Sequence, residues 1–141
     1  MSSTNTASAE GRVPDSGPLT DATAYRDNIF ALTQQAEDAV LRPVDCGLWP
    51  TDLRAALAAR LAARMGLASV AERYLTRVTG SNAVIADSTQ DGADLGLAAV
   101  VAFMDKAAME AHAVTAADIA GLQGAGISDA DIVRLCELNA F

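Results

Sequence analysis

Along most of the chain, apolar residues recur at helical spacing instead of alternating as they would in a strand. The first apolar face has intervals of four, three and four residues and consists of Tyr25, Ile29, Leu32 and Ala36. With Thr20 or Asp21 as the N-cap, this spacing predicts a helix that ends near Val40. An irregular connection bounded by two prolines follows at 43–50.

Start and stop signals divide the rest of the chain into further helices. Thr51 caps a helix over 51–66, and a third helix covers 68–78. The polar, glycine-containing stretch 80–94 predicts a long loop, which a helix over 95–113 follows. An acidic residue stands three positions after a hydroxyl residue at Thr115 and again at Ser128, a pattern typical of helix N-termini. These signals predict a bundle of about six helices.

Composition supports this all-α fold class. The chain contains 31 alanines among 141 residues and only 4% aromatic residues, which favours helices over a β-sandwich or barrel. Residues 1–20 are rich in small polar residues and predict a disordered N-terminal leader. Residues 21–141 then form a single all-α domain, because this length suffices for one core.

The charge excludes several partners. A net charge of −8 argues against nucleic acid and anionic membranes, and the chain has no uninterrupted apolar run long enough to cross a membrane. A helix-hairpin-helix that binds DNA through 121–138 is disfavoured, because Asp118, Asp129 and Asp131 would repel phosphate. The N-terminus lacks the features of a signal peptide, so we expect a cytoplasmic protein with no nucleic-acid or membrane partner.

The helix over 51–66 is apolar on every side. Leucines and Met65 follow one face, and alanines fill the opposite one. Such a helix needs neighbours all around it, and a second subunit would be one source of them. Residues 42–78 carry a net charge of +3 and residues 79–141 one of −7, so the two segments face each other within the fold or across an interface, or are simply two solvated faces. A homo-oligomer is therefore expected.

Three residues are candidates for chemistry. Arg64 lies within the apolar stripe and needs a carboxylate partner, a subunit contact or a substrate anion. His112 is the single histidine and would act in acid–base chemistry only if another helix brought it a partner. Cys46 is the thiol expected to be exposed, whereas Cys136 is expected to be buried. No metal-ligand spacing or cofactor motif is present, so we expect neither a metal nor a cofactor.

The segment TAADIAGLQGAGISDADIV at 115–133 and the Ala140-Phe141 end resemble the helical hairpin of the carboxymuconolactone decarboxylase and alkylhydroperoxidase D superfamily, in its peroxidase-related branch. The run over 53–60, followed by 71–74, is similar to the first core helix pair of that family. The resemblance implies an alkylhydroperoxidase D-like fold that assembles into homo-oligomers. Its peroxidase members use a Cys-x-x-Cys pair, which this sequence lacks.

Two functions are consistent with these observations. One is an alkylhydroperoxidase-related oxidoreductase-family protein without dithiol peroxidase activity, either a non-redox enzyme on a small-molecule substrate or a partner subunit. In that case Arg64, His112 and Cys46 would supply anion binding and proton transfer. The other is a non-catalytic helical module for oligomerisation or protein interaction. Whether the protein is an enzyme at all is left open by the sequence.

Overall fold

The computed structural model describes residues 16–141, and this part of the chain is helical without any strand. The α-helices are α2 (Pro18–Ala24), α3 (Asp27–Leu41), α4 (Thr51–Arg64), α5 (Ala68–Leu75), α6 (Ala83–Ala86), α7 (Ala98–Met109), α8 (Ala116–Gly124) and α9 (Asp129–Ala140). Short 3-10 turns η1 (Gly80–Asn82), η2 (Ala93–Leu95) and η3 (Ala111–Ala113) connect them. The predicted all-α class is confirmed, with more helices than the six expected because the first predicted helix is divided into α2 and α3 and because α6 lies in the predicted loop.

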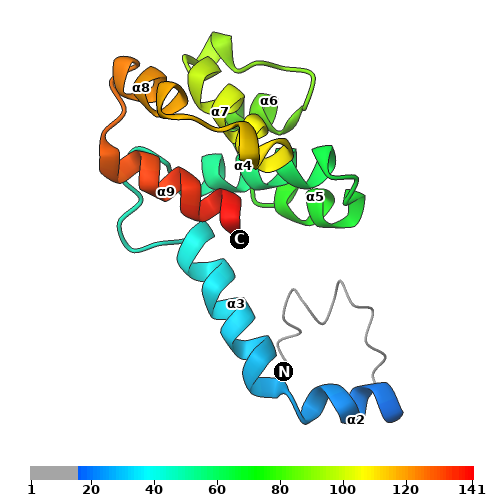
Figure 1. Cartoon of the computed structure of the whole chain (residues 1–141). Coiled ribbons are helices and arrows are strands. Elements are labelled where there is room, and N and C mark those ends of the chain that lie inside the picture. Colours follow the sequence, from blue (N-terminus) through cyan, green and yellow to red (C-terminus); the bar gives the residue numbers. More distant parts are fainter. Residues whose placement is uncertain (1–15) are drawn as a thin grey trace.

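Helix α4 is the centre of the body. It contacts α3, α5, α6, α7 and α9, and α8 packs on α7 and α9 (Figure 1). Its leucines and most of its alanines are buried by these neighbours, because small side chains let the other helices approach closely. The burial expected for this all-apolar helix is therefore intramolecular and does not need a second subunit.

The first predicted helix is in fact two helices. Helix α2 begins at Pro18, where proline is favoured at the first helical position. The chain then departs from helical geometry at Arg26 and resumes as α3. Of the predicted leader, residues 1–15 lie outside the described residues, and residues 18–20 belong to α2.

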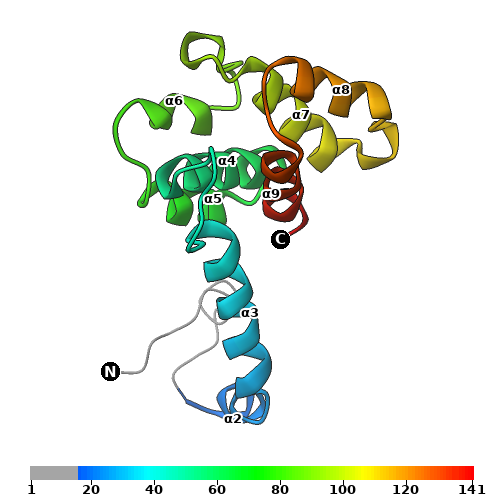
Figure 2. The same cartoon turned by 90° about the vertical axis from the view of Figure 1, so that its left-hand side faces the viewer.

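Helix α3 extends away from the body, with α2 at its far end (Figures 1 and 2). Only its C-terminal part contacts the body, through α4 and α9. Leu41 is buried there, and buried Glu37 pairs with Arg77 at 3.0 Å. The N-terminal half of α3 contains no buried residue.

The stretch predicted as a long loop at 80–94 is more ordered than expected. It contains η1, α6 and η2, and Ile85 in α6 is completely buried against the core. The following helix is shorter than predicted because Gly96 adopts a left-handed conformation that interrupts it before Ala98. Two of the predicted N-caps are confirmed: the Thr115 N–H donates to Asp118 at 2.7 Å, and Ser128 accepts from the Asp131 N–H. The others were wrong, because Thr51 is the first residue of α4 behind the N-cap Pro50, and Thr20 and Asp21 lie inside α2.

Candidate functional site

The three side chains predicted to carry chemistry lie in separate parts of the body. Cys46 is in the connection between α3 and α4, Arg64 is the last residue of α4, and His112 is in η3. Among residues 16–141, no hydrogen bond or ion pair joins any two of these side chains. They do not form one site in this structure.

Arg64 has the carboxylate partner that its position required. Its Nη1 lies 3.4 Å from Asp105 Oδ2 on α7. Arg60, one turn earlier, holds the same carboxylate with two hydrogen bonds of 2.8 Å, from Nε and Nη2. The basic and acidic segments of the chain therefore face each other within the fold at this point. Arg64 is thus engaged by a carboxylate of the fold itself, at the partly exposed edge of the Arg60–Asp105 pair.

Arg60 is the more deeply buried of the two arginines, with 3% of its side chain exposed. Besides Asp105, it donates to the backbone carbonyls of Ile85 and Asp87 at 3.2 and 2.7 Å. These bonds tie α6 and the chain that follows it to α4. These hydrogen bonds explain why the predicted loop over 80–94 is ordered. Nothing in the sequence distinguished Arg60 from the other five arginines of residues 42–78 for this role.

His112 and Cys46 show no activated geometry. His112 is exposed and lies in η3, after the end of α7 and not within it. The Cys46 thiol is half-buried and donates to the Pro43 carbonyl at 3.7 Å. Neither side chain has a base or acid partner among the described residues.

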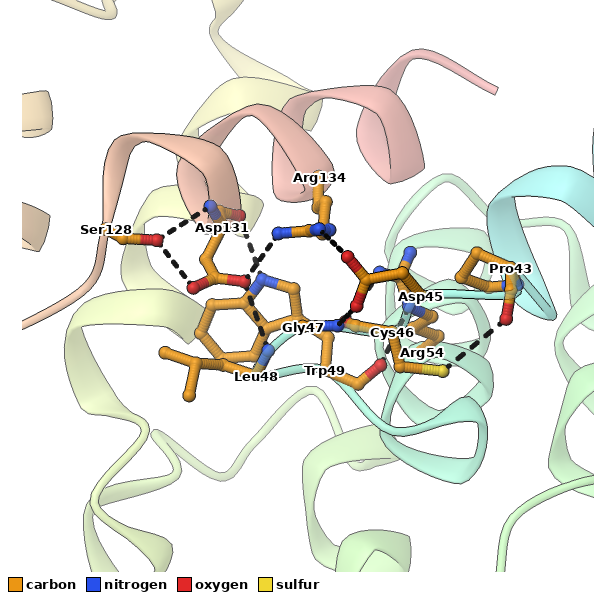
Figure 3. A network of polar contacts seen from close by, with 10 residues as sticks. All are labelled: Pro43, Asp45, Cys46, Gly47, Leu48, Trp49, Arg54, Ser128, Asp131 and Arg134. Carbon is orange, nitrogen blue, oxygen red and sulfur yellow. Dashed lines mark hydrogen bonds and ion pairs between the residues drawn. The ribbon is translucent and has the colours of Figure 1, made fainter.

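The dense polar network of the molecule surrounds Asp131 at the start of α9 (Figure 3). Its carboxylate accepts hydrogen bonds from the Ser128 hydroxyl at 2.6 Å and from the Leu48 N–H at 3.1 Å. Arg134 donates to the same carboxylate at 3.1 Å and also pairs with Asp45. Residues more than 80 positions apart are thereby joined, and the connection over 43–50 is fixed to α9.

The side chains of Arg54 and Trp49 complete this network. The Arg54 side chain, 2% exposed, donates to the carbonyls of Val40, Cys46 and Trp49 at 2.8 to 3.0 Å. The Trp49 indole N–H donates to the Asp131 carbonyl at 2.8 Å. Burial lowers the pKa of the Arg54 guanidinium below its usual value. Arg54 is thus satisfied by backbone carbonyls and not by a carboxylate.

Gly47 makes this approach of the connection to α9 sterically feasible. Its φ of 56° lies in the left-handed region, and a Cβ at this position would stand 2.2 Å from Asp131 Oδ1. Only glycine satisfies both conditions. The connection that the sequence marked only by its prolines is thus a structural clamp between α3, α4 and α9.

The network is suited to stability and not to proton transfer. In the described residues, no buried side-chain nitrogen or oxygen lacks a hydrogen-bond partner. The Ser128 hydroxyl, followed by the Leu48 N–H and Arg134, holds the pKa of Asp131 below its ordinary value of 3.8. A carboxylate that is ionised so firmly is a poor general acid at neutral pH.

This lowered pKa predicts a pH dependence of stability. Because folding lowers the pKa of Asp131, its stabilising contribution is present above pH 3.8 and disappears as the pH falls through the folded-state pKa. Urea unfolding between about pH 3 and 7 should show a gap in the free energy of unfolding between wild type and Asp131→Asn that is widest near neutral pH. The gap should narrow below pH 3.8; a gap of equal size at every pH would contradict this prediction. Asp129→Asn, on the same helix turn, is the control.

Two apolar cavities flank the end of α4 near α9. One, of about 430 Å³, is lined by Phe103, Cys136 and eight other residues, which are Leu61, Met65, Ala107, Ala108, Ala111, Val114, Asn139 and Ala140. The other, of about 140 Å³, shares Leu61, Met65 and Asn139 with it. Cys136, predicted to be buried, is exposed at the first cavity, because the face of α9 that enters the core carries Ile132, Leu135 and Leu138. Neither cavity is lined by Arg64, His112 or Cys46.

The most unusual surface is the predicted apolar face of α3. Of the predicted face Tyr25, Ile29, Leu32 and Ala36, the last three lie on α3, whereas Tyr25 is in the turn between α2 and α3; we name Ile29, Leu32 and Ala36 the α3 stripe. All four are exposed, with exposed fractions of 93% for Tyr25, 48% for Ile29 and 60% for Leu32. A different side of α3, with Glu37 and Leu41, meets the body, and the break at Arg26 separates Tyr25 from the rest of the predicted face. The stripe is the strongest candidate for a functional surface.

Other kinds of site find no support. Within residues 16–141, no group of three or more His, Cys, Asp or Glu side chains is arranged to hold a metal ion. No helix in the same range is long and apolar enough to cross a membrane. No family model, curated protein or solved structure matches this chain.

Proposed function

We propose that this protein is a helical interaction module, in which the body holds α3 outward so that the α3 stripe binds another helix. The carrying observation is the exposure of Ile29, Leu32 and Ala36 along one side of a helix that extends from the body (Figure 1), with exposed Tyr25 in the turn just before it. Contiguous exposed apolar surface on a monomer typically marks an interaction site. Apolar residues at intervals of three and four are the anchors that a helix presents to a partner helix.

The alternative suggested by the resemblance, small-molecule chemistry through Arg64, His112 and Cys46, has less support from geometry. Arg64 is engaged by Asp105, His112 is exposed without a partner in the described chain, and Cys46 lies by Pro43. A site for chemistry needs such groups to converge on one cavity. The α3 stripe needs no such convergence.

Photo-crosslinking tests the proposal. A photo-reactive phenylalanine analogue in place of Ile29 should give one cross-linked product of discrete mass in the producing cells. Adding Leu32→Asp should abolish that product, because a carboxylate in the stripe cannot be buried against another helix. The same analogue in place of Val133, an apolar residue of α9 that is 55% exposed, is the matched control and should give none. No product from position 29, or one that survives Leu32→Asp, would contradict the proposal.

A further inference from the structure

We propose that α2 and the outer part of α3 are a folding-on-binding device. We name residues 18–36 the arm. In the free chain the arm opens and closes while the body stays folded, and a partner on the α3 stripe holds it in the helical state. The inference rests on the proposed function and adds how binding at that surface is regulated. Three observations carry it: the lack of burial along the arm, its amino-acid sequence, and the contacts that fix the inner end of α3.

The arm lacks the packing that stabilises helices in proteins. None of its residues is buried. From α2 and α3, the hydrophobic core and the apolar residues packed against it include only Val40 and Leu41, which both lie beyond the arm. Figures 1 and 2 show the arm away from the body in both views. Because short helices without tertiary packing are marginal in water, the arm is expected to open easily.

The local sequence of the arm does not compensate for the missing burial. Helix α2 has only seven residues, and neither α2 nor α3 has a side-chain hydrogen bond at its N-cap. The break at Arg26 means that α2 is not a continuation of α3. Asn28 and Thr33 are poor helix formers, and the Thr33 hydroxyl donates back to the Ile29 carbonyl at 2.9 Å. Helix α4, which is rich in Ala and Leu and buried, has neither weakness.

The inner end of α3 is held by the body, so the arm opens from its free end. Leu41 is 2% exposed, Glu37 pairs with Arg77 at 3.0 Å, and Arg54 Nη1 donates to the Val40 carbonyl at 2.8 Å. These contacts fix the last turn of α3. Because the costly first turn of a helix is thereby already formed, the arm can close outward from it residue by residue. A partner that buries the stripe then shifts the arm to the helical state.

Hydrogen exchange of the purified full chain tests the opening. The amides of residues 31–36 should have protection factors between about 3 and 100, against more than about 1,000 in α4. Ala31→Gly should speed their exchange by about two- to fourfold and leave that of α4 unchanged, because glycine disfavours helix at this exposed position. No protection, protection equal to that of α4, or no acceleration by Ala31→Gly would overturn the inference.

The matched control places the same change in the body. Ala102→Gly, at an exposed position in the middle of α7, should leave the exchange of the arm unchanged. If either glycine variant accelerated the amides of the arm and of α4 by the same factor, the two parts would open together, and the inference would be wrong.

Cross-linking in cells tests the link to binding. The yield of the product from position 29 should fall by about two- to fourfold with Ala31→Gly, since only the helical arm binds, and should not change with Ala102→Gly. Ala31 lies on the side of α3 opposite the stripe, so this change leaves the binding face intact. An unchanged yield would overturn the inference and leave the proposed function standing. Absence of any product from position 29 would overturn the proposed function and, with it, the inference.

Discussion

Replacement of Arg54 by methionine is expected to lower the free energy of unfolding by about 3–5 kcal/mol. Methionine fills a similar volume, so the loss would come from the carbonyls of Val40, Cys46 and Trp49, which would lose the donors that Arg54 supplies at 2.8 to 3.0 Å. These carbonyls lie where α3, the connection and α4 meet, and water cannot reach them freely because the Arg54 site is 2% exposed. Urea unfolding monitored by circular dichroism measures the effect.

The matched control is Arg42→Met. Arg42 pairs with Asp38 on the surface of α3, and its side chain is 57% exposed. Exposed pairs of this kind contribute at most about 1 kcal/mol. If Arg54→Met cost no more than Arg42→Met, the buried network around Arg54 would not be what holds the connection in place.

The second large effect is expected at Asp105. Its replacement by alanine should lower the free energy of unfolding by about 3 kcal/mol, because Arg60 would keep its charge in a buried site without a carboxylate. Arg64→Ala should cost less than about 1 kcal/mol, since Arg64 is 34% exposed and contacts Asp105 at 3.4 Å. The two arginines of one cluster are thus predicted to differ because of their burial.

A double-mutant cycle separates the pair from its surroundings. Arg60→Ala, Asp105→Ala and the double variant should give a coupling free energy of about 1.5 kcal/mol or more. Additive effects would mean that Arg60 depends on the carbonyls of Ile85 and Asp87 instead of on Asp105. The same cycle with Arg64 and Asp105 should give a coupling close to zero and serves as the reference.

The helices themselves were largely predictable, because their signals are local. Thr51, Thr115 and Ser128 stand at or beside the observed starts of helices, whereas the first helix begins at Pro18, before the predicted caps Thr20 and Asp21. The break at Arg26 and the short helix α6 were not predicted, since neither is marked by a residue with a strong backbone preference. Buried Ile85 shows that α6 is stabilised by its contact with the core and not by its own sequence.

The candidate surfaces were only partly predictable. Helical periodicity identified the α3 stripe, but periodicity cannot say whether the chain supplies a neighbour for an apolar face. Cys136 illustrates the same limit: it lies near the apolar face of α9, and only the packing of Leu135 and Leu138 into the core leaves the thiol outside. The need of Arg64 for a carboxylate was visible in the sequence, whereas the identity of Asp105 was not.

By itself, the sequence determined the helical class and most helix starts, because capping, proline and glycine act within a few residues of chain. It also determined that α3 has an apolar face. The tertiary structure alone decided that Arg54 binds backbone carbonyls, that Asp131 clamps the connection to α9, and that the α3 stripe remains uncovered. These outcomes depend on contacts between segments far apart in the chain, and such contacts are set by how the faces of all the helices compete for one small core.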